Sequence, residues 1–271
     1  MIKFFRNFRK KLLKQGKTTN YLKYAIGEII LVVIGILIAL QINNWNEERK
    51  IQANQEKYLM LLKTEALNNL KEVNKALNAV STTNLWQTKI FELIDGNQDT
   101  ISEDYLSKSF GRVFAYTTSF KYENSALSEL KTSGDLKNGL NDSLRKYLIA
   151  LEPIVLNVKG QEQNVKQDFH ECSEYIKTNG SLRTSADQNG IGEIIGIPKS
   201  PKYKRSNIHL LSKDEFENNL IRYTGTTKNL VSNHYPDIEN HLKKIIETIN
   251  KGLEKNNQSL TIAGRQNTTN H

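Results

Sequence analysis

An unbroken apolar run near the N-terminus is the feature that most constrains the fold. From Ala25 to Ile42 the sequence reads AIGEIILVVIGILIALQI, and no polar residue interrupts Ile29 to Leu40. As an α-helix this segment would be about 27 Å long, close to the roughly 30 Å of bilayer hydrocarbon. A helix buried in a soluble bundle would carry polar residues at helical spacing, and this run has none. We therefore expect a transmembrane helix over 25–43, with a buried helical hairpin as the alternative.

Basic residues are concentrated ahead of the apolar run. The chain has a net charge of +9, and residues 1–24 hold eight Lys or Arg and no acidic residue, so the rest is close to neutral. After the run, the next basic residue is Arg49. The positive-inside rule then predicts that 1–24 are a cytoplasmic tail and that the chain after the span lies outside. The long basic stretch and the lack of a small-x-small site after Leu40 favour an uncleaved anchor over a signal peptide.

The basic tail indicates contact with lipid. Phe4, Phe5 and Phe8 are interleaved with basic side chains, which is typical of an amphipathic helix on an anionic membrane. A basic tail can also bind nucleic acid, but the apolar span that follows favours the lipid bilayer, so no nucleic-acid partner is expected. The residues expected to contact lipid headgroups are Lys3, Arg6, Arg9, Lys10, Lys11 and Lys14.

One face of the expected span contains a pair of small residues. Gly35 and Ala39 are four residues apart, a spacing that lets two helices approach closely. Glu28 lies seven residues before Gly35 and falls on nearly the same face. These three residues predict association with a second copy of the chain or with a partner membrane protein. The alternative is that Glu28 reaches the cytoplasmic headgroups and that the small pair is incidental.

A long helix is predicted to follow the span over 47–80, continuous with it because no Pro or Gly intervenes between Gly35 and Gly96. It carries a narrow apolar seam at three- and four-residue spacing. The seam fits a parallel dimer stalk or, as we expect, packing against later helices of the same chain. Its residues are Leu59, Leu62, Ala66, Leu70, Val73, Leu77 and Val80.

Further helices are predicted after a turn at 95–97. A short helix is expected over 102–111, with Ser102 as its cap and Gly111 as its end. Residues 114–120 alternate aromatic and polar side chains, and without a partner strand they predict an extended segment packed onto helices. Residues 125–132 are predicted to be helical and to end at Gly134.

The second half of the chain predicts further long helices. Asn141 or Asp142 caps a helix that Pro153 would kink or restart, and the apolar face runs to about residue 177. The Gly- and Pro-rich stretch 178–210 is expected to be a long loop, with a short hairpin at most. Ser212 to Glu215 forms a capping-box pattern, and Pro236 marks a restart.

The expected fold class is therefore all-α, with one N-terminal transmembrane helix followed by an extracytoplasmic antiparallel helical bundle with a long loop. The helical domain is assigned to residues 44–255, and residues 256–271 are expected to be a frayed tail.

No constellation of catalytic or metal-ligating residues is found in the sequence. His170 and Glu174 are one turn apart without a further ligand, and His234 and His241 are separated by Pro236. Residues 190–196 have the wrong glycine spacing for a dinucleotide loop. Cys172 is the only cysteine and lies on an apolar face, where a buried thiol is expected. We predict no enzyme activity, no cofactor and no metal.

The stretch from Tyr24 to Arg49, YAIGEIILVVIGILIALQINNWNEER, resembles the N-terminal signature of an uncharacterised family of single-span membrane proteins of the Bacteroidota. Residues 125–134 and 141–145 also resemble that family. The resemblance implies a bacterial inner-membrane protein with a periplasmic helical domain. Because the family has no assigned activity, the resemblance implies no catalytic residue.

Three hypotheses about function follow. The first is a non-enzymatic interaction or scaffold module anchored in the membrane. The second is a sensor-like module that binds a ligand outside and signals through a partner membrane protein, because only about 24 residues remain inside. The third is an enzyme with an unfamiliar site in 178–210.

Overall fold

The structure is a computed structural model, and it describes the chain except residues 1–17, 116, 135, 137–140, 202–204 and 269–271. For residues 18–22, 24–25 and 255–268 only the backbone is described. The described residues form helices and connecting segments without a strand, which confirms the all-α prediction. The chain divides into two compact units, Met1–Lys57 (unit 1) and Tyr58–His271 (unit 2).

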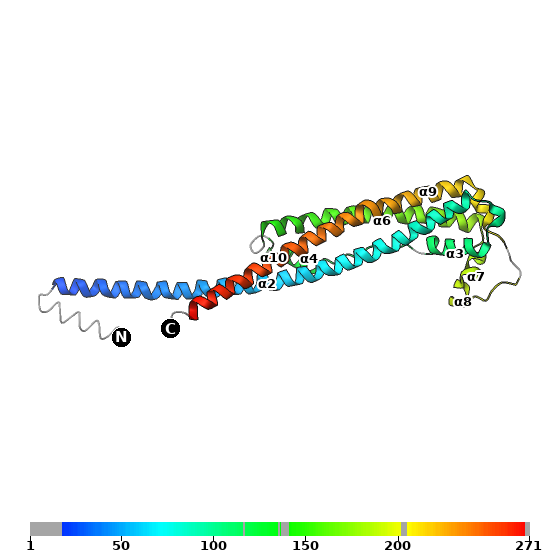
Figure 1. Ribbon diagram of the computed structural model, residues 1–271. Coiled ribbons are helices and arrows are strands. Elements are labelled where there is room, and N and C mark those ends of the chain that lie inside the picture. Colours follow the sequence, from blue (N-terminus) through cyan, green and yellow to red (C-terminus); the bar gives the residue numbers. More distant parts are fainter. Residues whose placement is uncertain (1–17, 116, 135, 137–140, 202–204, 269–271) are drawn as a thin grey trace. The chain divides into compact units, whose positions relative to one another are not determined.

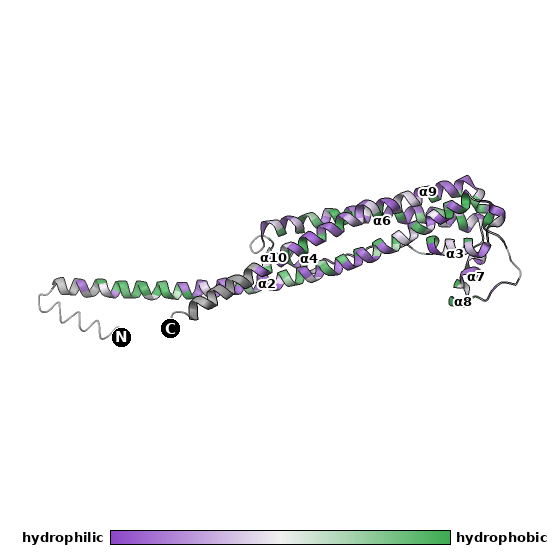
Figure 2. Ribbon diagram, in the orientation of Figure 1, coloured by the Kyte–Doolittle hydropathy of each residue, from purple (hydrophilic) through white to green (hydrophobic). Residues whose placement is uncertain are grey.

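Helix α2 (Thr18–Ile94) is continuous from the apolar run through the helix predicted over 47–80, as the absence of Pro and Gly predicts, and it extends past the predicted end to Ile94. In unit 1 its large apolar side chains from Ile29 to Leu40 are 47% to 73% exposed, on every face of the helix. They form the green stretch of α2 in Figure 2. By length and composition this part of α2 is able to cross a membrane, and none of it is buried within the protein.

In unit 2 the same helix buries one face. Five residues of the predicted seam are less than 9% exposed, and Leu70 and Leu77 are partly buried against the core. Leu59 lies against α10 near Gly252, and Gln87 accepts a hydrogen bond of 3.0 Å from the Thr227 hydroxyl of α9. The seam therefore packs against helices of the same chain, as expected. The buried seam residues are Leu59, Leu62, Ala66, Val73 and Val80.

Unit 2 is built around three further long helices (Figure 1), α6 (Asp142–Asn179), α9 (Asp214–Asn229) and α10 (Tyr235–Thr268). Helix α6 packs against both α9 and α10. A π-helical turn, η3 (Leu230–His234), joins α9 to α10 and ends just before Pro236, where a restart was predicted. Of the two outcomes predicted at Pro153, a kink or a restart, the restart is wrong, because α6 runs through Pro153, whose side chain is exposed.

Helix α3 (Glu103–Phe114) differs from its prediction at both ends. Ser102 occupies the N-cap position but makes no side-chain cap, and Gly111 lies inside the helix rather than at its end. A Cβ on Gly111 would be 2.9 Å from the Asn189 amide, so this glycine allows close packing and does not stop the helix. Before α3, a short 3-10 turn, η1 (Gln98–Thr100), follows α2. Helix α4 (Ser125–Ser133) ends at Gly134 with φ of +80°, as predicted.

The long loop predicted over 178–210 is wrong in part. The stretch contains α7 (Leu182–Asn189), α8 (Ile191–Ile194) and the start of the 3-10 turn η2 (Ile208–Ser212). Ser181 caps α7, and the buried side chain of Asn207 accepts the Ser181 N–H at 2.6 Å and donates to its carbonyl at 3.1 Å. These contacts come from a residue 26 positions away, which local sequence patterns do not reveal.

The capping box predicted at Ser212 is also wrong. Ser212 lies in η2, and its hydroxyl donates to the His209 carbonyl instead of capping α9. Lys213 is the N-cap residue of α9, and its side chain makes no cap. The acidic residues of the first turn, Asp214, Glu215 and Glu217, provide the favourable charge at this helix start.

Aromatic rings join α3, α6 and α9 at the end of unit 2 where α2 ends. The ring centroid of Phe110 in α3 lies 5.6 Å from that of Phe216 in α9, and the ring centroid of Phe114 lies 6.2 Å from that of Tyr223. Phe169 of α6 contacts the same tyrosine edge to face at 5.9 Å. Such pairs add about 0.5–1.5 kcal/mol each beyond the area they bury.

Cys172 tests how tightly this core is packed. Its thiol is fully buried on α6, and burial, with smaller contributions from Asp168 and Glu171, raises its pKa to about 12. We expect the folded protein to resist a maleimide at neutral pH and the protein in urea to react with one thiol per chain, because the thiolate is the reactive form. Mass spectrometry before and after unfolding measures this. Rapid labelling of the folded protein would contradict the buried position.

Candidate functional site

The segment 117–124, named here the strap, is extended and crosses between helices of unit 2. Its backbone finds hydrogen-bond partners in side chains instead of a neighbouring strand. The Phe120 N–H donates to Glu162 at 2.6 Å, and the Phe120 carbonyl accepts from the Lys159 ammonium. At Glu123 the buried side chain of Asn69 accepts the N–H at 2.8 Å and donates to the carbonyl at 2.7 Å. The extended segment predicted over 114–120 is thus confirmed for 117–120, whereas Phe114 belongs to α3 and residue 116 lies outside the described residues.

Glu162 is the point where the strap, α6 and α10 meet. Its carboxylate also accepts from the Tyr235 hydroxyl at 2.9 Å and pairs with Lys159 at 2.8 Å. Lys159 lies 5.1 Å from the Phe120 ring centroid as well. Burial, and then the negative charge of Glu162, raise the pKa of Tyr235, so this tyrosine stays a neutral donor. A buried carboxylate with three donors, one of them a cation, is a satisfied group.

Glu65 holds the start of α4, directly after the strap. Its carboxylate on α2 accepts the N–H of Ala126 at 2.6 Å and that of Leu127 at 3.4 Å, which are orphan donors at the start of α4. Burial raises the pKa of Glu65, and these two hydrogen bonds oppose the increase. Glu65 therefore replaces the cap that Asn124, the N-cap residue of α4, does not provide.

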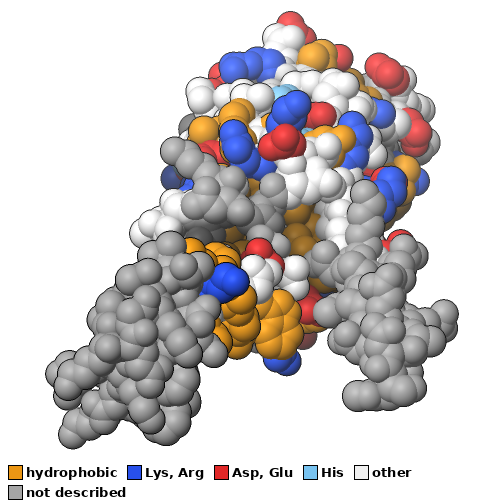
Figure 3. Space-filling model, turned by 90° about the vertical axis from the view of Figure 1, so that its left-hand side faces the viewer, with side chains coloured by type: hydrophobic (Ala, Val, Ile, Leu, Met, Phe, Trp, Pro, Cys, Tyr) orange, Lys and Arg blue, Asp and Glu red, His pale blue; other side chains and the backbone are white. Residues whose placement is uncertain are grey.

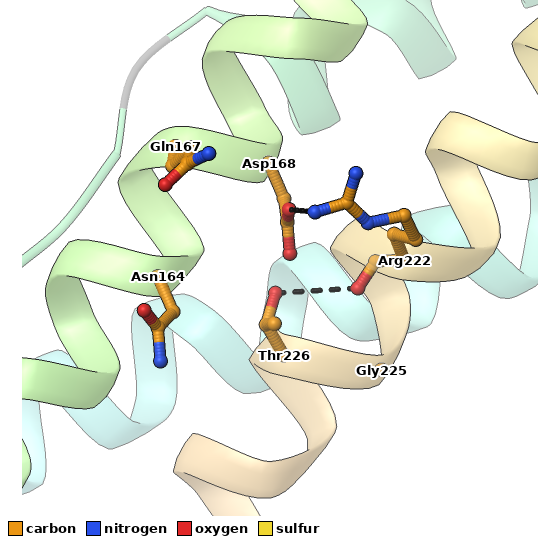
Figure 4. Close-up of a pocket in the computed structure, with 6 residues that line it drawn as sticks. All are labelled: Asn164, Gln167, Asp168, Arg222, Gly225 and Thr226. Atoms are coloured by element: carbon orange, nitrogen blue, oxygen red, sulfur yellow. Dashed lines mark hydrogen bonds and ion pairs between the residues drawn. The ribbon is translucent and has the colours of Figure 1, made fainter.

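A shallow polar hollow lies between α6 and α9 (Figure 4). It has a volume of about 300 Å³, and in the figure Asp168 and Arg222 point toward one another across it. Asp168 is 4% exposed and lies 3.1 Å from the Arg222 guanidinium, which also pairs with Glu171 at 2.9 Å. The hollow is lined by Asn164, Gln167, Asp168, Arg222, Gly225 and Thr226.

The lining of this hollow consists mainly of hydrogen-bonding and charged side chains. It presents amide, hydroxyl and guanidinium groups, and neither a Ser or Cys paired with a base nor a His is among its lining residues. Because Arg222 is 60% exposed and already has two carboxylate partners, it would bind an added anion only weakly.

The residues predicted to associate in the membrane all lie on α2 in unit 1. A Cβ placed on Gly35 would meet no atom within 4 Å, and Ala39 is exposed. No other described part of the chain covers this position, so the structure leaves it open to a partner. Glu28 is half-buried. The predicted lipid-headgroup residues Lys3, Arg6, Arg9, Lys10, Lys11 and Lys14 lie outside the described residues.

The histidines considered as metal ligands have other contacts. His241 lies 2.8 Å from the Tyr147 carbonyl, His234 lies 3.4 Å from the Asn229 amide, and Glu174 near His170 pairs with Lys177. Among the described residues, no group of three His, Cys, Asp or Glu side chains is placed to hold a metal ion.

Sequence reasoning missed the residues that hold the strap and the start of α4. Glu65, Asn69 and Glu162 are polar residues on long helices, and such residues are usually solvated. One signal was present. Glu65 and Asn69 are one turn apart and directly precede the seam residues Ala66 and Leu70, so they lie at the edge of the buried face.

Replacing Glu65 tests how much the stability of unit 2 depends on the acceptor at the start of α4. We expect Glu65→Ala to lower the free energy of unfolding by about 1–3 kcal/mol, because two buried N–H groups lose their acceptor. Glu92→Ala, at an exposed position of the same helix, is the control and should change it by less than about 0.5 kcal/mol. Chemical denaturation measures both.

The difference in unfolding free energy between the wild type and Glu65→Ala is also expected to depend on pH. The pKa of Glu65 is higher in the folded protein than its ordinary 4.5, so the folded state binds a proton more readily than the unfolded state. The stability of the wild type relative to Glu65→Ala should therefore rise as pH falls through the folded pKa toward 4.5. A difference that is constant with pH, or that shrinks on acidification, would contradict the raised pKa.

Comparison with known proteins gives a match to a family model over residues 28–126. No curated protein and no solved structure matches the chain significantly. The matched family segment begins at Glu28 and ends at Ala126, so it contains most of α2, α3, the strap and both residues of the Glu65–Ala126 hydrogen bond. Over residues 28–126 the chain is similar to DUF6090, which is described as a family of unknown function.

Proposed function

We propose that the protein is anchored in the bacterial inner membrane by α2 and that unit 2 is a non-enzymatic interaction or scaffold module in the periplasm. The observation that carries the anchor is the exposure of large apolar side chains on all faces of α2 between Ile29 and Leu40. A helix that is apolar all round is normally buried in protein or in lipid, and here no described part of the protein covers it.

The free energy gained when aliphatic side chains leave water supports a position of this helix in lipid. Each large aliphatic side chain contributes about 1.5–3 kcal/mol when it leaves water. An uninterrupted run of them on one helix therefore strongly favours the bilayer. Trp45, 62% exposed, follows the run at the position where an interfacial aromatic residue is expected.

Charge supports the orientation. Every charged side chain in residues 1–24 is positive. In the view of Figure 3, by contrast, basic and acidic side chains are interspersed over the helical surface. The positive-inside rule places such a tail in the cytoplasm and unit 2 on the opposite side.

Interaction is favoured over catalysis by what the buried polar groups do. Asn69 and Glu162 are engaged by the backbone of the strap and Glu65 by the backbone at the start of α4, so these side chains hold the fold and offer no acid or base to a substrate. A sensor-like module is the second candidate, and the polar hollow around Arg222 is the observation that favours it.

Membrane insertion provides the main test. We expect the full chain to remain in the membrane after alkaline carbonate, with a C-terminal reporter active in the periplasm. Ile34→Asp/Leu37→Asp should release it, because each Asp near the bilayer centre costs about 3 kcal/mol. Ile34→Leu/Leu37→Ile is the matched control and should stay in the membrane. A wild-type chain found in the soluble fraction would refute the anchor.

The partner is tested on the small-residue face. Gly35→Leu/Ala39→Leu should abolish co-purification of a crosslinked membrane partner or second copy, because the larger side chains separate the helices. Gly27→Leu, about 100° away around the helix, is the control and should have no effect. Survival of the complex in the Gly35→Leu/Ala39→Leu variant would refute this interface.

Arg222→Ala separates the two candidate functions, since a sensor would lose ligand-dependent partner binding and a scaffold would not.

A further inference from the structure

We propose that the α8 region of unit 2 is a docking surface for an anionic phospholipid bilayer, separate from the α2 anchor. The docking tip comprises Ile191, Ile194, Ile195 and Ile197, together with the basic side chains of Lys199 and Arg205. Ile194 is 84% exposed and Ile195 61%, which makes Ile194 the most exposed large hydrophobic residue described in the chain.

The tip is a built structure that holds these isoleucines outward. Gly190 and Gly196 have φ of +68° and +76°, so the chain turns sharply on both sides of α8. The Ile197 N–H donates to the Gly192 carbonyl at 2.7 Å, and a Cβ on Gly192 would lie 3.0 Å from the Ile197 carbonyl. This close approach shapes the loop without covering Ile194 or Ile195.

Asp187 fixes the base of the tip. Its carboxylate accepts from the Arg183 Nε at 3.1 Å and from the Ser200 N–H at 3.2 Å, while Arg183 also donates to the Pro198 carbonyl. The segment after α8 is thereby tied back to α7. An apolar surface held in place in this way is typical of an interaction site.

A hollow of about 610 Å³ lies at the base of the tip, where Asp187 lines it together with both basic residues of the tip. Its acidic lining residues are already engaged. Glu103 accepts from the Ser206 hydroxyl and the Asn207 N–H, and Asp187 is engaged as above. The Arg205 guanidinium makes no ion pair with any described residue, and Lys199 has only the exposed Glu193 at 3.7 Å. The hollow therefore offers cationic groups to phosphate oxygens next to an apolar surface.

Charge selects the lipid surface among possible occupants. Between Ile194 and Ser212 the sequence contains four Lys or Arg and no acidic residue. Two copies of the tip would repel one another, so a second copy of this chain is disfavoured. Isoleucines that enter the headgroup boundary, flanked by Lys and Arg at the level of the phosphates, are the arrangement by which peripheral elements bind anionic bilayers.

The test uses the full chain with a fluorescent reporter at the tip. Ile191→Cys is labelled with the environment-sensitive dye NBD, since Cys172 is buried, and the protein is reconstituted in phosphatidylcholine vesicles. Target vesicles carrying nitroxide-labelled lipid are then added, either of phosphatidylcholine alone or with phosphatidylglycerol. We expect quenching by the phosphatidylglycerol vesicles only. The same dye at Ile221→Cys, another exposed isoleucine, should not be quenched.

Variants then separate the two contributions. Ile194→Asn should weaken binding about tenfold through lost apolar contact, and Lys199→Gln and Arg205→Gln about fivefold each through lost attraction. Lys228→Gln, an exposed lysine on α9, is the control. Equal quenching by both vesicles, absence of quenching, an unaffected Ile194→Asn variant, or contact between labelled copies without target vesicles would each overturn the proposal. The dye at the tip reports on this surface whether or not α2 crosses a membrane.

Discussion

The buried carboxylates of Glu162 and Glu65 are the interactions on which the arrangement of unit 2 depends. An extended segment inside a helical bundle has backbone donors and acceptors that no helix or sheet satisfies, and leaving them unpaired in the core is costly. Glu162, Lys159 and Asn69 supply those partners from side chains, and Glu65 supplies them for the start of α4. The strap can therefore lie between the helices and bury Phe120, which is 1% exposed.

Helix α2 combines two environments in one element. Its first part exposes apolar side chains on all faces, while its second part buries a narrow seam and exposes Lys, Glu and Asn (Figure 2). If the first part of α2 spans a bilayer, as proposed, the change in pattern follows from the different surroundings of the two parts. A helix in hydrocarbon must be apolar all round because water does not reach it, whereas a helix at the edge of a bundle needs only one apolar stripe. The matched family segment covers both parts of this helix.

The proposals for function use what the fold leaves open. The polar groups in the core are engaged by backbone, but the small-residue face around Gly35 and the isoleucines around α8 have no cover within the described chain. One surface suits a second helix in a bilayer, and the other suits the headgroup boundary. A protein that interacts at both would hold unit 2 by contacts of different strength, one permanent and one dependent on lipid charge.

The sequence by itself determined the helical class, the continuous α2, the apolar run, the seam and the glycine at the end of α4. These features depend on local periodicity, on chain breakers and on the hydrophobicity of neighbours, all of which are visible along the chain. Only the tertiary structure decided that Glu162 holds the strap and Glu65 the start of α4, that Asn207 folds the stretch after Gly180 into α7 and α8, and that Pro153 and Gly111 lie inside helices. Each of these depends on a partner many residues away or on the space beside one side chain, and contacts between distant residues exist only once the helices have packed.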